Sequence, residues 1–324
     1  MPRPEWEIPE SLRPKPEDYG YDLDRALASV VSLSAIIPDD AFTADVLGTE
    51  RSGSGVLIRK DGIVLTIGYL VTEAETVWLG LSDGRSVEGH VLGFDQETGF
   101  GLVQALAKVD LPALPLGKSA DAELGTRVVI AGAGGRSRSV AARIVAKQEF
   151  AGYWEYVLDE AIFAAPSHPL WGGTGLIGPG GELLGIGSLQ LEQSREGGRS
   201  EHLNMVVPID LLPPILDDLM TLGRPNRPSR PWLGLYATEA QDRVIIAGLS
   251  EKGPAARADL RQGDVVLSVG NRKVDKLGTL FKSIWSLGEA GAEVPLVVNR
   301  DGETLTVRVT SGDRNRFLKR PKLH

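Results

Sequence analysis

The chain has 324 residues, enough for two or three domains, and its 42% hydrophobic and 24% charged residues are ordinary for a globular protein. The formal net charge of −8 argues against general affinity for nucleic acid or anionic membrane. There is no cysteine and only four histidines are present, dispersed along the chain, so we expect neither a disulfide, a metal site nor a cofactor.

The N-terminal segment shows no targeting signal. Residues 1–9 lack an apolar core and a small-residue cleavage site, so we expect a cytoplasmic protein, or a periplasmic one if a leader has been removed. Residues 1–22 are rich in proline and predict an extended arm. The arm carries Trp6, Tyr19 and Tyr21, which either anchor an oligomer or pack on the chain's own surface; both interpretations stay open.

Residues 23–222 read mainly as β structure. Asp22 is a plausible N-cap for a short helix through Ala28, and short apolar runs separated by tight turns follow. Two such groups of strands, at 53–116 and 127–186, predict two packed antiparallel barrels, and therefore a fold dominated by β structure. A closing helix is expected from Val206 to Leu222.

The last third of the chain carries a second set of motifs. Residues 223–231 form a proline-rich, positively charged linker, and 313–324 form a basic tail. Between them stand Pro231-Trp232-Leu233-Gly234-Leu235, Gly253-Pro254-Ala255-Ala256 and Gln262-Gly263-Asp264-Val265. In order and spacing these motifs resemble a small α+β PDZ domain of the HtrA (high-temperature-requirement) type, over residues 232–312.

The glycine-dense stretch at residues 167–175 and the hairpin after it resemble the nucleophile loop of trypsin-like proteases of the HtrA branch. That branch has a pattern like N-P-G-N-S-G-G-P-L here, which places its serine at Gly172. The histidine pattern I-L-T-N-N-H-V-V places Tyr69 at the base position, and T-D-L-A-V-L places Gly99 at the acid position. A phenol with a pKa near ~10 is a poor general base, so the resemblance implies a protease fold that is not an enzyme.

The oxyanion loop also departs from the family. Leu170 takes the place of a glycine that donates its N–H, and Trp171 stands beside the nucleophile position. We expect Leu170 and Trp171 to fill former substrate space as packed core; a new ligand site is the alternative. His168 lies on the loop itself, near Ser167 and Thr174, and is interpreted as a hydrogen-bonded loop residue rather than a relocated base.

The PDZ-like segment predicts peptide binding. The run Trp232-Leu233-Gly234-Leu235 resembles a carboxylate-binding loop, and Leu280 and Ile284 are candidate pocket walls on the facing helix. The alternative is that this strand edge is occupied by the chain's own segments or by the barrel.

Three functions remain open from the sequence. The first is an inactive HtrA-like homologue (a pseudoprotease) that binds protein or peptide C-termini as a scaffold or regulatory subunit. Its expected assembly is a homotrimer, or a hetero-oligomer with an active HtrA-like protease. The second is an active endopeptidase of protein quality control with relocated catalytic residues. The third is an oligomeric, chaperone-like structural protein.

Overall fold

The computed structural model describes residues 6–194 and 200–319. By their contacts the residues divide into two compact units. The barrel unit comprises Met1–Gln148, Glu160–Asn226 and Lys319–His324. The sheet unit comprises Glu149–Asp159 and Arg227–Leu318, so a segment from the middle of the chain belongs with its C-terminal third.

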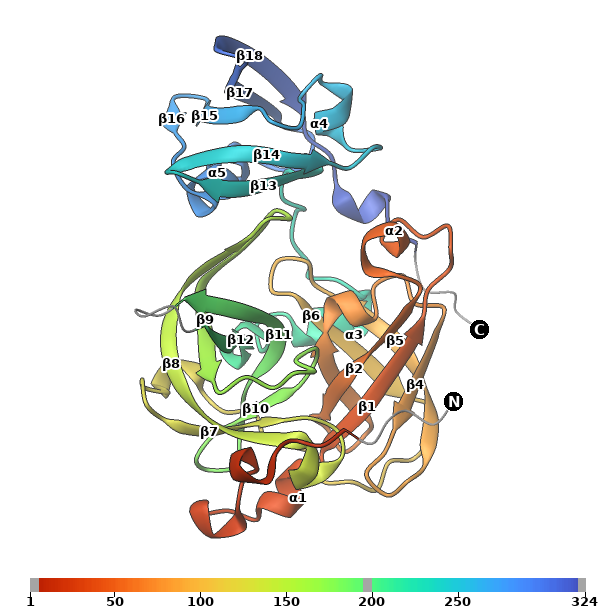
Figure 1. The fold of residues 1–324 in the computed structure, drawn as a ribbon. Helices are drawn as coiled ribbons and strands as arrows, with labels where there is room; N and C mark the ends of the chain where they lie inside the picture. Colours follow the sequence, from red (N-terminus) through yellow and green to blue (C-terminus); the bar gives the residue numbers. More distant parts are fainter. Residues whose placement is uncertain (1–5, 195–199, 320–324) are drawn as a thin grey trace. The chain divides into compact units, whose positions relative to one another are not determined.

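Six strands of the barrel unit close into a first barrel in the order β1-β2-β3-β6-β5-β4 (Figure 1). Two of the turns that join them occur at the Asp-Gly pairs 61–62 and 83–84, where Gly62 and Gly84 adopt φ values of 90° and 87° that favour glycine. The strands are β1 (Val30–Ile36), β2 (Glu50–Leu57), β3 (Ile63–Ile67), β4 (Thr76–Gly80), β5 (Ser86–Phe94) and β6 (Phe100–Ala105).

Six more strands close into a second barrel in the order β10-β11-β12-β9-β8-β7, and the prediction of two antiparallel barrels is confirmed. Alternate apolar side chains, including Val128, Ile130, Ile162 and Val206, form its buried core. The strands are β7 (Arg127–Ala131), β8 (Ser139–Gly152), β9 (Tyr156–Ala165), β10 (Gly175–Ile177), β11 (Leu183–Ser194) and β12 (Ser200–Pro208).

The described residues of the barrel unit form three short α-helices, α1 (Leu23–Leu27), α2 (Ala44–Leu47) and α3 (Leu216–Leu222). Asp22 caps α1 as predicted, its side chain accepting from the Arg25 N–H at 3.0 Å. The expected start of the closing helix at Val206 is wrong. The β-branched Val206 and Val207 continue β12 in its ladder with β11, and α3 begins only at Leu216.

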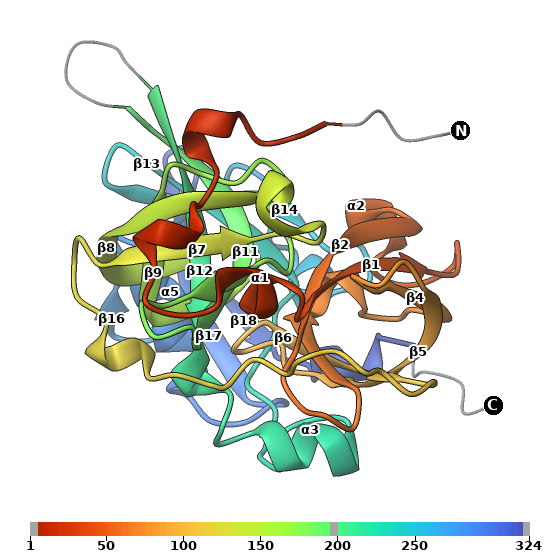
Figure 2. The same ribbon diagram turned by 90° about the horizontal axis from the view of Figure 1, so that it is seen from below.

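The N-terminal arm packs on the second barrel from Trp6 onward, so its predicted extended state is wrong for the described residues (Figure 2). Ile8 is 2% exposed in the barrel core, and its N–H donates to the Ser137 carbonyl at 2.9 Å. The arm then forms the 3-10 turns Glu10–Leu12 and Pro16–Asp18. The sequence did not indicate this role of Ile8, because the residues that share its core come from strands distant in the sequence.

The sheet unit has strands in the order β13-β14-β15-β17-β18, with β16 beside β15. The helix α5 (Leu277–Trp285) buries Leu280, Phe281 and Ile284 in the same apolar core as the strands. The remaining elements are β13 (Leu235–Ala240), β14 (Arg243–Leu249), α4 (Pro254–Arg257), β15 (Val265–Val269), β16 (Arg272–Lys273), β17 (Glu293–Arg300) and β18 (Glu303–Thr310).

The end of the chain is built into both units. Residues Arg314–Arg316 form a 3-10 turn, and the Phe317 ring lies 4.9 Å from the Trp232 ring in the sheet unit. In the barrel unit the Lys319 N–H donates to the buried Glu73 carboxylate at 2.9 Å. The described part of the predicted basic tail is therefore partly packed, with Asn315 and Arg316 exposed, and residues 320–324 lie outside the described residues. Among the described helices, none is long and apolar enough to cross a membrane.

Candidate functional site

The three positions that the resemblance assigns to a catalytic triad lie together in the barrel unit. Tyr69 follows Gly68 at the end of β3, and the Gly68 N–H donates to the Gly99 carbonyl at 2.6 Å. A Cβ added to Gly172 would lie 2.8 Å from the Tyr69 hydroxyl. The fold therefore forms the site, and the residues placed there are a phenol and two glycines.

Tyr69 fills the space that a nucleophile at position 172 would need. Its hydroxyl donates to the Ser188 carbonyl at 2.9 Å, and burial raises its pKa above the ordinary tyrosine value. A phenol that stays protonated and bonded to a carbonyl cannot accept a proton at neutral pH. Real Cβ atoms essentially never approach an oxygen as closely as 2.8 Å, so a side chain at 172 would require Tyr69 to move.

Two glycines of the site have backbone conformations that disfavour other residues. Gly99 has φ 86°, and Gly173 has φ 76°. A Cβ on Gly173 would also lie 1.8 Å from the Ser54 carbonyl oxygen. The carbonyl of Gly172 accepts from the Ser54 N–H at 2.8 Å, which ties this loop to β2. The loop is thus fixed by close backbone packing.

His168 is a buried structural residue, as its loop position predicted. Its Nδ1 accepts from the Leu170 N–H at 3.1 Å, which leaves Nε2 to donate to the Arg138 carbonyl at 2.8 Å. Burial lowers the pKa of His168, so the neutral ring is favoured. The sequence did not indicate the partner that fixes this loop, Asn204, whose Oδ1 accepts from the His168 N–H at 2.6 Å.

The bonding of His168 changes the oxyanion loop. The resemblance places an oxyanion donor at the Leu170 N–H. In the structure this N–H donates to the His168 ring instead. Leu170 itself is 54% exposed, so the expectation that it fills a packed core is wrong. The turn that directs its N–H inward leaves its side chain in solvent. Trp171 is half-buried, and its carbonyl accepts from the Thr174 hydroxyl at 2.8 Å.

Ser167 and His168 are not arranged as a relocated nucleophile and base. The Ser167 hydroxyl accepts from the Gln190 amide at 2.9 Å, while both ring nitrogens of His168 are engaged elsewhere. Within residues 6–194 and 200–319, no group of three His, Cys, Asp or Glu side chains could hold a metal ion.

In the sheet unit the predicted carboxylate-binding loop holds a carboxylate from the chain itself. The N–H groups of Leu233, Gly234 and Leu235 donate to the side chain of Glu155, at 3.1, 2.7 and 3.1 Å for the shortest contact of each. Glu155 lies in the turn between β8 and β9 and is 7% exposed. Of the two sequence interpretations, the structure favours occupation by the chain's own segment.

The N–H of Trp232, the first residue of this run, donates to the Gly312 carbonyl at 3.0 Å, and the residue is 8% exposed. Its assignment as a peptide-binding residue stays a prediction. Leu280 and Ile284 are fully buried, and the cluster that contains them includes Val157 from the start of β9. Both side chains are therefore part of the apolar core of the sheet unit, and their role as pocket walls stays a prediction.

The Glu155 carboxylate is electrostatically unusual. Burial raises its pKa to about 7, while the three N–H donors and the positive charge of Arg314 act in the opposite direction. Nothing in the sequence singled out Glu155, because one glutamate among 43 acidic residues carries no spacing signal. The nearest hint is that four aromatic residues flank it in the sequence, Phe150, Tyr153, Trp154 and Tyr156.

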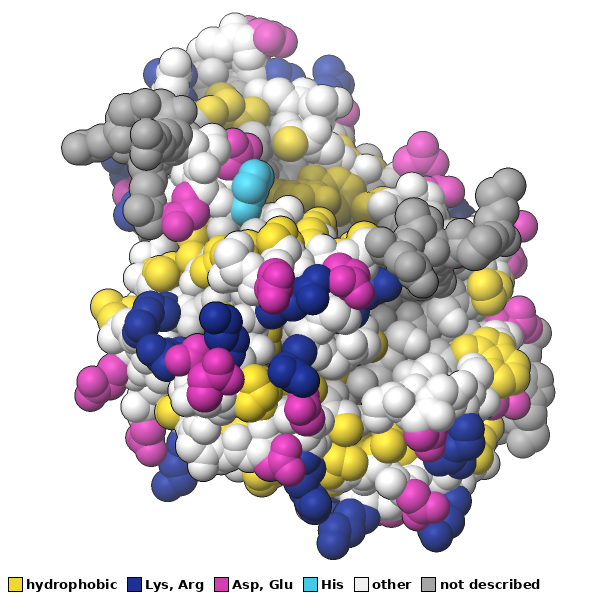
Figure 3. All heavy atoms as spheres, turned by 60° about the horizontal axis from the view of Figure 1, so that its bottom comes forward, with side chains coloured by type: hydrophobic (Ala, Val, Ile, Leu, Met, Phe, Trp, Pro, Cys, Tyr) yellow, Lys and Arg dark blue, Asp and Glu magenta, His cyan; other side chains and the backbone are white. Residues whose placement is uncertain are grey.

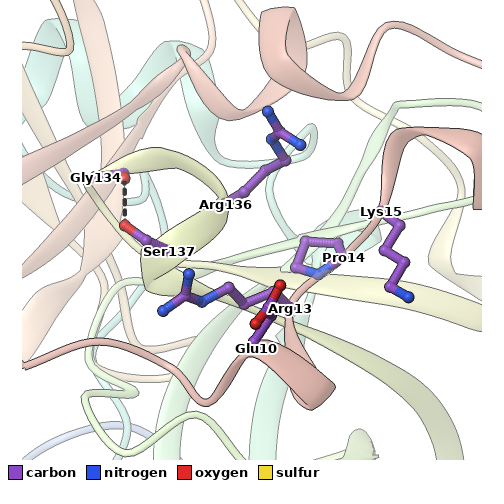
Figure 4. A pocket seen from close by; sticks show the side chains of 7 residues that line it. All are labelled: Glu10, Arg13, Pro14, Lys15, Gly134, Arg136 and Ser137. Atoms are coloured by element: carbon purple, nitrogen blue, oxygen red, sulfur yellow. Dashed lines mark hydrogen bonds between the residues drawn. The ribbon is translucent and has the colours of Figure 1, made fainter.

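A separate pocket of about 480 Å³ lies beside the N-terminal arm and is drawn in Figure 4. Two of its three basic lining residues have acidic partners: Arg13 pairs with Glu7 at 2.6 Å, and Arg136 pairs with Asp24 at 2.9 Å. On the described part of the face in Figure 3, basic and acidic side chains are interspersed rather than gathered by sign.

Comparison with known proteins agrees with this architecture. Residues 53–186 match the family model of the trypsin-like peptidase domain, and residues 231–310 match that of the PDZ domain. The chain therefore contains a trypsin-like peptidase domain and a PDZ domain. It is similar to DegP-like, DegS and HtrA serine proteases.

One relative is a probable periplasmic serine endoprotease DegP-like of Halomonas elongata, 31% identical over 81% of this chain. The chain spans about half of that relative's length, 56%. The serine endoprotease DegS of Escherichia coli strain K12 is 25% identical over 80% of this chain and 76% of the relative.

Solved structures show the same fold. The HtrA-type protease AlgW with tripeptide has a TM-score of 0.52 at 21% identity, covering 93% of this chain and 97% of that one. The serine endoprotease from Yersinia pestis has a TM-score of 0.52 at 22% identity, covering 89% and 95%.

Proposed function

We propose that this chain is a catalytically inactive HtrA-like protease homologue that binds protein or peptide chains through its PDZ domain. In this role it serves as a scaffold or as the regulatory subunit of an active relative. The observation that carries the proposal is the Tyr69 hydroxyl, which stands 2.8 Å from where a side chain at Gly172 would begin.

The chemistry of the site supports this function. Peptide hydrolysis by the trypsin-like fold needs a nucleophile, a base that accepts its proton and a group that orients the base. Gly172 and Gly99 have no side chain, and Tyr69 is a bonded phenol with a raised pKa. Losing such residues costs on the order of 10⁶ in kcat in a comparable serine protease. The named activity of the relatives is therefore not carried over to this chain.

The proposal is tested by labelling the purified chain with a fluorophosphonate probe and by assaying casein hydrolysis, beside an active DegP-like relative as positive control. We expect labelling and hydrolysis of the relative alone. Labelling of this chain that is blocked by prior heat denaturation and maps to a single serine would refute the proposal and favour relocated catalytic residues.

A binding protein of this kind would act within an assembly, and we retain a homotrimer, or a hetero-oligomer with an active HtrA-like protease, as the proposed state. The structure limits how much surface the aromatic residues of the arm can offer to such an interface. The Trp6 ring lies 4.5 Å from the Arg138 guanidinium and 5.7 Å from the His168 ring. Tyr21 packs beside Gly181. These rings are partly covered within one chain, so they can contribute only their remaining surface to an interface.

A further inference from the structure

The turn between β8 and β9 supplies the PDZ groove with the groups that a peptide C-terminus would supply. A groove of this kind holds a chain terminus through successive backbone N–H groups. Here the N–H groups of Leu233, Gly234 and Leu235 converge on Glu155, and Gly234 donates at 2.7 Å to the same oxygen that Leu235 contacts at 3.1 Å. The Glu155 side-chain carboxylate thus takes the position that the C-terminal carboxylate of a bound peptide would occupy.

One further contact of the turn matches the backbone pairing of a bound peptide. The Tyr153 carbonyl accepts from the Ala237 N–H of the edge strand β13 at 3.0 Å, which is a bond that an added strand would make. After the turn, Val157 is 8% exposed and belongs to the apolar core that also contains Leu280 and Ile284. The anion site and a backbone pairing position of the groove are therefore occupied by the turn.

The turn is held in this position against its own backbone preference. Glu155 has φ 61°, a region disfavoured for residues with a side chain and retained only where the surroundings impose it. The base of the turn is fastened by Lys282 of α5, whose Nζ pairs with Glu149 at 2.7 Å and also contacts Asp159. Contacts at both tip and base indicate a specific docked state.

We propose that the segment Glu149–Asp159 is an internal ligand of the PDZ groove, and that an external peptide with a free C-terminal carboxylate binds by displacing it. This inference rests on the proposed peptide-binding function and adds its regulation. A tethered competitor acts at an effective concentration that reaches the millimolar range for short linkers. The apparent Kd of an external peptide rises by the reciprocal of the fraction of open grooves.

The test uses the full chain and a fluorescein-labelled decapeptide that ends in valine, an apolar residue chosen because the candidate pocket walls Leu280 and Ile284 are apolar. Fluorescence polarisation gives its Kd, with the C-terminally amidated decapeptide as probe control. Glu155→Gly removes the carboxylate and tolerates the positive φ of the turn. Glu155→Gln is the milder second variant. Glu160→Gln is the matched control, because Glu160 is an exposed residue of β9 whose ion pair is with Lys147.

We expect Glu155→Gly to bind the free-carboxylate peptide at least tenfold more tightly than the wild type, and Glu160→Gln to match the wild type. Hydrogen exchange at the amides of Leu233, Gly234 and Leu235 should accelerate in Glu155→Gly without peptide. Equal affinity in wild type and both Glu155 variants would overturn the internal-ligand proposal while leaving peptide binding intact. Unchanged exchange would also overturn it. Accelerated exchange with no binding by any variant would uphold the occupancy and refute the proposed function.

Discussion

Tyr69 and Gly172 are complementary residues, since the phenol occupies the volume that a side chain at 172 would enter. We expect Gly172→Ser to destabilise the chain by about 1–3 kcal/mol, the usual cost of overpacking. In Tyr69→His/Gly172→Ser the cost should shrink, because the smaller ring makes room. Urea unfolding of both single variants and the double variant measures this coupling. Strictly additive effects would show that the two side chains do not compete.

Restoring the three triad residues should not restore the activity of the family. In Tyr69→His/Gly99→Asp/Gly172→Ser, the Leu170 N–H is still bonded to His168, and an aspartate must adopt φ near 86°. An oxyanion donor alone is worth ~10²–10³ in rate. We expect kcat/KM on a fluorogenic peptide to stay at least about 10²-fold below an active DegP-like relative. Equal values would show that the loop readily reorganises.

Glu155 gives the groove a pH dependence. The pKa of the docked carboxyl is about 7, above its ordinary value of 4.5, so docking takes up a proton between these values. The docked turn is therefore favoured at low pH and loses stability as pH rises through about 7. The facing groups are the three N–H donors, Arg314 and Tyr236. The Gly234 amide resonance should titrate near pH 7 in the wild type and stay constant in Glu155→Gln. A midpoint near 4.5 would contradict this.

At the scale of elements, the arm is part of the second barrel through Ile8. Because Ile8 is 2% exposed, Ile8→Ala should lower the free energy of unfolding by about 2–5 kcal/mol. Ile36→Ala is the matched control: Ile36 lies on β1 but is 48% exposed, so its truncation should cost far less. Equal effects of the two variants in urea unfolding would indicate that the arm detaches from the barrel in solution.

The strands could be predicted because their signals are local. Asp-Gly pairs between apolar runs fix hairpin turns, and glycine at positive φ is what those turns need. The closing helix shows the limit of local signals. Val206 and Val207 directly precede the helical segment in the sequence, yet they pair with Gly187 and Ile186 of β11 and continue β12. A pairing partner distant in sequence decided their conformation.

The candidate site was predictable to the extent that it follows the family pattern. The resemblance assigned Tyr69, Gly99 and Gly172, and the fold brings these positions together. The contacts of His168 with Asn204 and Arg138, and of Glu155 with Leu233 to Leu235, join residues 30 to 80 positions apart. No periodicity or motif spacing encodes such pairs, because each depends on how whole strands are placed.

At the scale of the whole molecule, assembly is open to direct measurement. We expect multi-angle light scattering at micromolar concentration to give the mass of an oligomer, trimer first, because a chain without catalysis would act through partners. Mixing with an active DegP-like relative from the same source tests the hetero-oligomer. A mass of 34.7 kDa, unchanged on mixing, would establish a monomer and remove assembly from the proposed function.

The assignment of Glu149–Asp159 to the sheet unit means that this unit is not a continuous piece of sequence. A fragment starting at Arg227 would contain every strand of the sheet but lack the turn that covers its groove. Such a fragment would present Leu233, Gly234 and Leu235 uncovered, and would behave as a different receptor from the one in the intact chain. Affinities measured on the excised domain therefore describe the open groove alone, and a survey of ligands with it would overstate what the full-length protein retains.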